Sequence, residues 1–321
     1  MQEKSFFISG GTGSFGSNFI SLLLKKRKNI KKIVIFSRDE VKQLDLKKKL
    51  AKYSKKLRFL IGDVRDLERV KEAISDCEVV IHAAALKQVD TCEYNPLESI
   101  KTNIIGTDNI IKACLSLNVK KSLLISTDKA VNPINLYGAC KLSAEKIFIA
   151  ANNIKGKNKT KFSVVRYGNV SYSRGSVLEL FLNLKKNYNE KFLPLTNEKM
   201  TRFAISIEDA TLFVYKCIQI MKSSEVFVPK LKAYKVIDII KCLNKKYKII
   251  GIRPGEKIHE TLISKDELAK TIFKKSYFVI LPSYRKNNLS KKFNDGYKSN
   301  IEGNFLGQNE LKRIINEKNK V

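Results

Sequence analysis

The chain lacks several features that would assign it quickly to a class. Its 321 residues include no tryptophan, three methionines and two histidines, His82 and His259. The six cysteines are scattered and form no Cys-x-x-Cys pair, so neither a zinc site nor a disulfide framework is expected. We therefore expect no bound metal, and free thiols that are mostly buried.

Long apolar runs are also missing. No stretch approaches the roughly 18–20 apolar residues that a membrane helix needs. The first six residues, MQEKSF, lead directly into a short apolar run and lack the layout of a signal peptide. Hydrophobic residues still make up 43% of the chain, which is enough for a sizeable core. The sequence thus predicts a soluble, cytoplasmic, globular protein without membrane insertion.

Acidic residues are few relative to basic ones. The chain has 62 Lys and Arg against 31 Asp and Glu, a formal net charge of +31. Such a charge ordinarily suggests nucleic acid or an anionic membrane as partner. However, only 11 of the 62 are Arg, and base and phosphate recognition favours the planar Arg fork. We interpret the dispersed lysines as solvated surface residues and expect no nucleic-acid partner; attraction of an anionic ligand is the alternative.

Short apolar runs alternate with helix-length segments through the first half of the chain. Six of them are predicted to be strands, at residues 6–8, 33–36, 57–61, 79–81, 122–125 and 162–166, with a helix at 109–117. This rhythm predicts the α/β class, with repeated βαβ units and a Rossmann-like doubly wound parallel sheet.

The rhythm breaks after about residue 171. We assign residues 1–170 to the Rossmann domain, with the segment around 200–222 returning to it. Residues 171–321 are assigned mainly to a smaller C-terminal substrate-binding domain and a tail. The segment 285–305, rich in Asn, Lys, Gly and Ser, is expected to be an extended surface tail.

A glycine-rich segment, SGGTGSFG at residues 9–16, follows the first strand and opens a helix. Glycines allow a tight turn and let the backbone approach a pyrophosphate, which then lies at the positive end of the helix. The segment predicts a dinucleotide site formed by Gly10, Thr12, Gly13, Ser14, Phe15 and Gly16.

The end of the second strand should contact the adenosine ribose. An acidic residue there accepts the 2′-hydroxyl of NAD, whereas a basic residue accommodates the 2′-phosphate of NADP. Ser37 and Arg38 come first, with Lys42 one turn further on, so NADP is favoured, while Asp39 leaves NAD open. The pair Asp63-Val64, after the third strand, falls where an adenine contact would lie.

Tyr137 and Lys141 form a Y-x-x-x-K pattern after the fifth strand. A spacing of four places them on one helix face, one turn apart. An ammonium beside a phenol should lower the tyrosine pKa and produce a usable base. Together with the glycine segment, this pattern resembles the extended short-chain dehydrogenase/reductase superfamily.

Further segments narrow the resemblance to the configuration-inverting UDP-N-acetylglucosamine 4,6-dehydratases of pseudaminic-acid biosynthesis. They are IGDVRD at 61–66, HAAALK at 82–87, STDKA at 126–130, RYGNV at 166–170, MTRF at 200–203 and RPGEK at 253–257. The resemblance spans residues 4–281. The sequence departs from it at residues 86–89, LKQV, where relatives usually carry Lys-His, and at residues 171–173, SYS, which puts substrate detail in doubt.

The resemblance implies a reaction. Tyr137, supported by Lys141, takes the proton of the sugar 4-hydroxyl while C4 is oxidised. Lys129 then removes the C5 proton and Asp128 protonates the departing 6-hydroxyl, and C5 is reprotonated from the opposite face. A surface ion pair is the plainer interpretation of Asp128-Lys129.

The resemblance also implies further site residues and a homo-oligomer. For the cofactor these are Ala83, Ala84, Ala85, Lys87 and Asn103, with Tyr137 and Lys141. For the UDP-sugar substrate they are Lys87, Thr127, Tyr137, Asn169, Arg174, Arg202, Arg253 and Glu256. Arg suits the diphosphate because its fork binds two phosphate oxygens.

Two other functions stay open at this point. A retaining 4,6-dehydratase or a 4-epimerase of another UDP-sugar would share the fold, but an epimerase has no use for Asp128-Lys129 as a second acid–base pair. A non-catalytic nucleotide-sensing or nucleic-acid-binding protein on this fold is the alternative from a different class.

Overall fold

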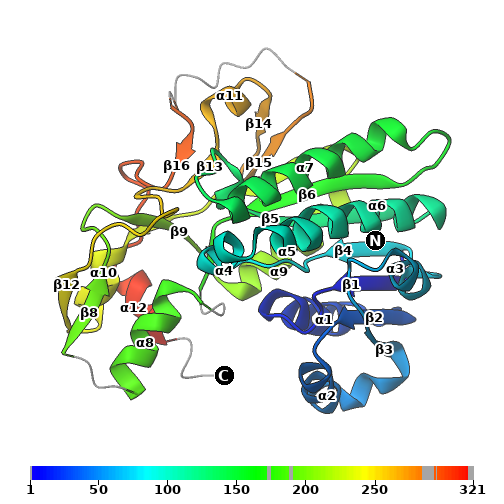
Figure 1. Cartoon of the computed structure of the whole chain (residues 1–321), viewed down its shortest axis with the longest axis horizontal. Helices are drawn as coiled ribbons and strands as arrows, with labels where there is room; N and C mark the ends of the chain where they lie inside the picture. Colours follow the sequence, from blue (N-terminus) through cyan, green and yellow to red (C-terminus); the bar gives the residue numbers. More distant parts are fainter. Residues whose placement is uncertain (1, 172–174, 188–190, 284–292, 294, 317–321) are drawn as a thin grey trace.

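The structure is a computed structural model that describes residues 2–171, 175–187, 191–283, 293 and 295–316 (Figure 1). A nine-stranded sheet runs through its larger part in the order β14-β15-β10-β6-β5-β4-β1-β2-β3. The strands are β1 (Ser5–Ser9), β2 (Lys32–Ser37), β3 (Leu57–Ile61), β4 (Val79–His82), β5 (Lys121–Thr127), β6 (Lys161–Tyr167), β10 (Val226–Pro229), β14 (Thr271–Phe273) and β15 (Tyr277–Ile280).

The strands from β3 to β10 are parallel, and the six predicted from the sequence are all present. Most are apolar on both faces because helices cover both sides of the sheet, and β1 is buried at every position. The chain moves outward from β1 in one direction and from β4 in the other. The carboxyl ends of these two neighbours therefore form the switch point where α/β sheets bind ligands.

Helices flank the sheet on both faces (Figure 1). On one face α1 (Ser14–Lys26) packs against α9 (Ile207–Ile220), and on the other α6 (Gly106–Ser116) lies between α3 (Leu67–Ile74) and α7 (Leu136–Ile154). Side-chain oxygens cap several helix starts by accepting a backbone N–H. They belong to Asp39 before α2 (Glu40–Lys49), Asp66 before α3, Asn135 before α7 and Ser206 before α9.

A smaller part follows β6 and has its own apolar cluster, which includes Phe181, Leu193 and Ile240. Its elements are β7 (Asn169–Val170), α8 (Val177–Asn187), β8 (Phe192–Leu195), β9 (Thr201–Ile205), β11 (Ala233–Lys235), α10 (Val236–Cys242), β12 (Lys246–Ile249) and α12 (Gln308–Asn316). Strands β11, β9 and β7 form one small sheet, and β12 and β8 form another.

Segments beyond residue 171 also complete the large sheet. Strand β10 extends it in parallel beside β6, and β15 and β14 then add two antiparallel strands. The apolar runs of β10 and β15 find their buried positions there rather than in the smaller part. The division of the chain at residues 170 and 171 stays a prediction.

The expectation of a surface tail at 285–305 is wrong for part of the segment, because residues 296, 297 and 299 are buried. Tyr297, in β16 (Tyr297–Lys298), is only 3% exposed, and its hydroxyl donates to the Leu231 carbonyl at 2.6 Å. Strand β16 pairs with β13 (Thr261–Ile263), and Ser299 is fully buried. A polar composition concealed these few inward-facing residues. Residues 285–292 and 294 lie outside the described part of the chain.

The cysteines are unpaired thiols, as expected, and five of the six are buried. Within the described ranges, no helix is both long enough and apolar enough to cross a membrane. Nor do those residues bring three or more His, Cys, Asp or Glu side chains together in an arrangement that could hold a metal ion.

Candidate active site

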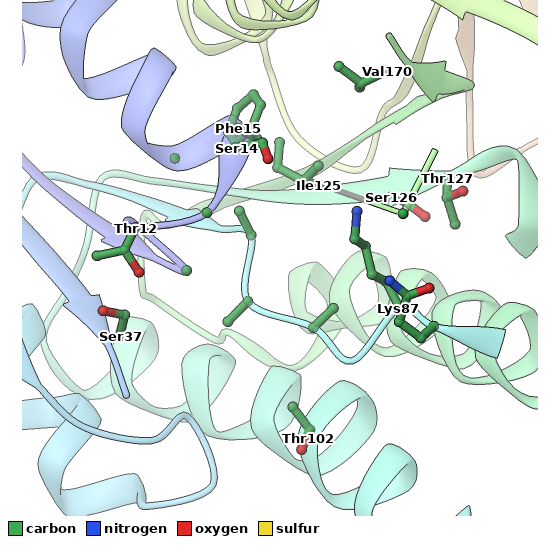
Figure 2. Close-up of a pocket in the computed structure, with 18 of the residues that line it drawn as sticks. Thr12, Ser14, Phe15, Ser37, Lys87, Thr102, Ile125, Ser126, Thr127 and Val170 are labelled. Carbon is green, nitrogen blue, oxygen red and sulfur yellow. The ribbon is translucent and has the colours of Figure 1, made fainter. Parts of the chain in front are cut away.

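A cavity of about 600 Å³ opens at the carboxyl ends of the parallel strands, across the switch point between β1 and β4. Figure 2 shows the glycine segment with Thr12 and Ser14 on one side of it and the end of β5, with Ser126 and Thr127, on another. The cavity thus joins the predicted dinucleotide residues to the predicted catalytic ones.

The glycine segment forms a close cradle at the start of α1. A Cβ atom at Gly10 would lie 2.9 Å from the Ala84 nitrogen, and one at Gly16 would lie 2.5 Å from the Gly10 carbonyl oxygen. Gly10 also has a φ of +65°, which glycine adopts readily. Gly13 is the N-cap residue of α1 and has no side chain that could accept a hydrogen bond from the first N–H groups of the helix. These residues fit a bound pyrophosphate.

The predicted cofactor residues line this cavity, with one exception. Those that do are Gly10, Thr12, Gly13, Ser14, Phe15, Gly16, Ser37, Arg38, Lys42, Asp63, Val64, Ala83, Ala84, Ala85, Lys87, Tyr137 and Lys141. Asn103 does not: it is buried, and its side-chain amide binds both the N–H and the carbonyl of Leu86, at 2.9 and 2.8 Å. It therefore supports the loop after β4 from behind.

At the predicted ribose end, the acidic residues already have partners. The Asp39 carboxylate accepts the Lys42 backbone N–H at 2.9 Å and also pairs with the Lys42 ammonium. Arg38 lies 3.5 Å from Asp63. Burial raises the pKa of Asp63, but hydrogen bonds from Arg65 outweigh that effect and the pKa is lowered overall. Arg38 keeps a half-exposed guanidinium toward the cavity.

Tyr137 and Lys141 lie on α7 and both reach the cavity, but their electrostatics differ from the prediction. Burial raises the pKa of Tyr137 to about 12, and the opposing effects of Lys129 and Thr127 are smaller. The expected lowering is therefore wrong for this arrangement. The Lys141 ammonium donates to the Ile125 carbonyl at 2.7 Å, and burial lowers its pKa to about 8. Lys141 thus keeps most of its charge at pH 7 but loses it near pH 8, well below the range of an ordinary lysine.

Asp128 and Lys129 form a buried cluster at the end of β5, in the short helical turn η3 (Asp128–Ala130). Asp128 is fully buried, which excludes the surface ion pair considered above. The Lys129 ammonium lies 3.0 Å from Asp128 Oδ1, 3.1 Å from Asn169 Oδ1 and 3.4 Å from Glu260 Oε1. Burial lowers the pKa of Lys129, but the two carboxylates outweigh it and raise the pKa overall.

The predicted substrate residues divide into two groups. Lys87, Thr127, Tyr137 and Asn169 line the cavity. Arg202, Arg253 and Glu256 do not. Arg202 is 5% exposed and its guanidinium donates to the carbonyls of Thr201 and Ile258, at 2.8 and 3.1 Å. Glu256 pairs with Arg202 at 3.4 Å, and Arg253 is exposed. Arg174 lies outside the described residues.

Sequence reasoning missed several residues of this region. Gln88, Ser176 and Ile207 line the cavity, and the carboxylate of Glu260 lies against Lys129. No spacing rule could have found Glu260, because about 130 residues separate it from Lys129 and only the tertiary fold brings them together.

Comparison with known proteins finds relatives over nearly the whole length of the chain. A family model described as "Polysaccharide biosynthesis protein" matches residues 6–282. The UDP-N-acetylglucosamine 4,6-dehydratase (inverting) of Campylobacter jejuni subsp. jejuni serotype O:2 is 45% identical, covering 98% of both chains. The UDP-glucose 4-epimerase of Rickettsia bellii (strain OSU 85-389) is 43% identical over 92% of this chain and 88% of its own length.

A solved structure matches the fold over nearly the whole chain. The X-ray structure of Pen from Bacillus thuringiensis superposes with a TM-score of 0.91 at 34% identity, covering 99% of this chain and 98% of the other. The architecture described above is therefore that of a solved relative over nearly its full length.

Proposed function

The chain belongs to the polysaccharide biosynthesis protein family, and from this premise we propose that it is a UDP-N-acetylglucosamine 4,6-dehydratase that inverts C5. The product would be a UDP-4-keto-6-deoxy-L-arabino-hexulose, used for pseudaminic acid or a related surface glycan. The observation that carries the proposal is one cavity lined by both Tyr137 and Lys129, with Asp128 hydrogen-bonded to Lys129 behind it.

The first step requires a base at the sugar 4-hydroxyl. Tyr137 takes this proton, and Lys129 and Thr127 partly offset the burial that disfavours its phenolate. When bound, the dinucleotide would accept a hydride from C4 in its oxidised form and return it to C6 in its reduced form, and the positive charge of the oxidised ring would favour the phenolate. Lys141 lies one turn after Tyr137 on α7, and its ammonium donates a hydrogen bond to the Ile125 carbonyl at the end of β5.

The second step removes water across C5 and C6. The 4-ketone acidifies the C5 proton, which Lys129 accepts as an amine, while Asp128, which lies just behind Lys129 and becomes reachable if the sugar displaces the wall of the cavity, donates a proton to the departing 6-hydroxyl. Burial raises the pKa of Asp128, the charge of Lys129 opposes this, and the net rise suits a proton donor. Protonation of C5 from the opposite face then inverts this centre.

A 4-epimerase is the second candidate, because the Rickettsia relative bears that name at similar identity. An epimerase would need the Tyr137 step alone. The buried Asp128-Lys129 cluster would then have no chemical task, although burying charged groups is costly. The dehydratase accounts for both sets of residues.

The test is incubation with UDP-N-acetylglucosamine in heavy water, followed by NMR. We expect a 4-keto-6-deoxy product of L-arabino configuration with one deuterium at C5. Asp128→Asn and Lys129→Ala should each lose about 10²–10⁴-fold in product formation while still binding the dinucleotide. A C4 epimer as product, a retained C5 configuration, or normal turnover in both variants would each overturn the assignment.

We further propose NADP as the cofactor. The support is that Arg38 and Lys42 line the ribose end of the cavity, while Asp39 is occupied as the cap of α2 and as the partner of Lys42. A 2′-phosphate would meet the half-exposed guanidinium of Arg38 and could draw Lys42 away from Asp39, whereas a 2′-hydroxyl would have to compete with Lys42 for Asp39.

Titration calorimetry with NADP and NAD tests this choice. Wild-type protein should bind NADP more tightly, and Arg38→Ala should weaken NADP binding about 10- to 100-fold, because a charge-assisted hydrogen bond is lost. NAD binding should change little. Tighter binding of NAD by the wild-type protein would refute the proposal.

Two further properties rest on the sequence: a cytoplasmic location on its composition and N-terminal pattern, and a homo-oligomer on the resemblance. We propose that the protein acts in the cytoplasm and assembles into a homo-oligomer.

A further inference from the structure

Glu260 is a buried carboxylate that the proposed steps do not use. It lies directly before β13 and is 2% exposed. Its Oε1 atom is 3.4 Å from the Lys129 ammonium and 3.9 Å from Nε of Arg202. Its Oε2 atom is buried and has no hydrogen-bond partner among the residues that the structure describes. An unpaired buried carboxylate oxygen is costly, so it calls for an explanation.

The backbone fixes this carboxylate in place. The Glu260 N–H donates to Ser299 Oγ at 2.9 Å, and the Ser299 N–H donates to the Glu260 carbonyl at 2.8 Å. Ser299 is fully buried and is itself hydrogen-bonded to Thr201 in β9. The C-terminal part of the chain thus holds Glu260 against η3 through two well-formed hydrogen bonds.

Lys129 is consequently shared between two carboxylates and one amide. An ammonium has three donor hydrogens, and its three acceptors here are Asp128, Asn169 and Glu260. Asp128 also has one buried oxygen, Oδ2, without a partner in the described part of the chain. The cluster therefore presents two unpaired carboxylate oxygens around one proton-carrying nitrogen.

Lys129 and Arg202 together keep Glu260 charged. Burial raises the pKa of Glu260, but Lys129 and Arg202 outweigh it, so the pKa is lowered and the carboxylate stays ionised. The other charged and titratable groups facing the cluster are Lys257 of the preceding loop, Tyr137 of α7 and Tyr234 of β11. This explains why Arg202 is buried here, away from the cavity.

We propose that Glu260 is the positioning residue of the dehydration step, which orients the Lys129 nitrogen and sets the pH range in which Lys129 and Asp128 exchange protons with the sugar. This inference rests on the proposed function. Transfer of one proton from Lys129 to Asp128 gives an amine and a carboxylic acid. The amine takes the C5 proton, the acid protonates the leaving 6-hydroxyl, and water departs. The cluster then holds its original ammonium and carboxylates, and Glu260 remains ionised throughout.

Glu260→Gln keeps an acceptor oxygen but removes the charge. A nearby negative charge raises the pKa of both Lys129 and Asp128, so its removal lowers both. Lys129 then loses its proton at lower pH, and Asp128 also loses its proton at lower pH. Both limbs of the kcat profile should therefore move in the acidic direction, by about one pH unit. Glu260→Asp, which keeps the charge, should retain the wild-type profile.

Glu260→Ala also removes the acceptor, and we expect kcat for dehydration to fall about 10²-fold with KM unchanged, because Glu260 does not line the cavity. Oxidation at C4 should be unaffected. The 6-deoxy analogue of UDP-N-acetylglucosamine tests this, since it can be oxidised but not dehydrated, and the absorbance of the reduced nicotinamide reports it in a single turnover.

Glu225→Gln is the matched control. Glu225 is also buried, at 6% exposure, and bonds to Ser163, but it precedes β10 at the end of the sheet away from the cavity. It should keep the wild-type pH profile. An unchanged profile in Glu260→Gln together with normal kcat in Glu260→Ala overturns the inference, as does an equal shift in Glu225→Gln. If Glu260→Gln and Glu260→Ala do not fold, a shifted profile in Glu260→Asp overturns it as well. Absence of dehydration by the wild-type protein refutes the proposed function instead.

Discussion

His82 is a buried histidine that bridges two elements of the dinucleotide site. Its Nδ1 lies 2.7 Å from the Ser9 hydroxyl and its Nε2 lies 3.0 Å from the Thr107 hydroxyl. Ser9 Oγ in turn accepts the N–H groups of Ala83 and Ala84, which line the cavity. A neutral ring thus fixes the loop after β4 against the glycine segment.

This arrangement makes stability depend on pH. Burial lowers the pKa of His82 from 6.5 to about 3. Between these values the unfolded chain binds a proton that the folded chain does not, so the free energy of unfolding falls as pH drops below 6.5. When the pH falls from 6.5 to 5, this histidine alone should lower the free energy of unfolding by about 2 kcal/mol.

Denaturant unfolding at these two pH values measures the effect. The control is His82→Asn, whose amide can replace Nδ1 toward Ser9 without titrating. The variant should lose about 2 kcal/mol less than the wild type over the same interval. Equal losses in both proteins would show that His82 does not supply this dependence.

Motifs confined to a few residues could be predicted from the sequence. The glycine segment and Tyr137-Lys141 could each be recognised because the spacing within each motif is local, and both motifs line the cavity. The pKa of Tyr137 could not be predicted, because burial determines it and burial depends on the whole fold. Arg202 was predicted to bind a phosphate, and its actual surroundings could not be predicted for a related reason. The sequence reveals its charge, but not that backbone carbonyls and Glu256 occupy its guanidinium.

At the scale of elements, α7 and η3 meet without any intervening side chain. A Cβ atom at Gly138, in the first turn of α7, would lie 2.3 Å from the Lys129 carbonyl oxygen. This close approach places Tyr137 and Lys129 on the same cavity. The glycine is needed for the distance between two backbones, rather than for a turn.

Gly138→Ala should therefore push η3 away from α7 and lower kcat about 10²-fold, because a small displacement of a catalytic group is costly. Alanine favours a helix over glycine by about 1 kcal/mol, so α7 itself should still form. Steady-state kinetics with circular dichroism as a check on folding tests this. Ala139→Gly, at the exposed neighbouring position, should weaken the helix yet keep wild-type kcat. Wild-type kcat in Gly138→Ala would contradict the packing argument.

Strand prediction succeeded where burial on both faces leaves a continuous apolar run, as in β1 and β2. The apolar pattern could not reveal which strands pair with one another. The pairing of β15 with β10 joins segments about 50 residues apart, and nothing local in Tyr277–Ile280 specifies an antiparallel neighbour.

At the scale of the whole molecule, the net charge of +31 divides between two settings. Lysines such as Lys47, Lys48 and Lys49 are exposed on α2, as the surface interpretation predicted. A smaller set lines the cavity, including Arg38, Lys42 and Lys87. Asp39 and Asp63 pair with Lys42 and Arg38 at the ribose end, but over the whole cavity the cationic side chains outnumber these two carboxylates, so the field there favours the approach of anionic phosphates.

The position of β10 in the sheet also matters before the protein is complete. About 60 residues separate the end of β6 from the start of β10, its hydrogen-bonded neighbour. At about 5–20 residues per second, a ribosome needs several seconds to deliver this stretch. Meanwhile β6 presents an open, apolar edge on the nascent chain, and such edges pair readily with other strands. The emerging chain therefore carries an unpaired edge strand until β10 arrives.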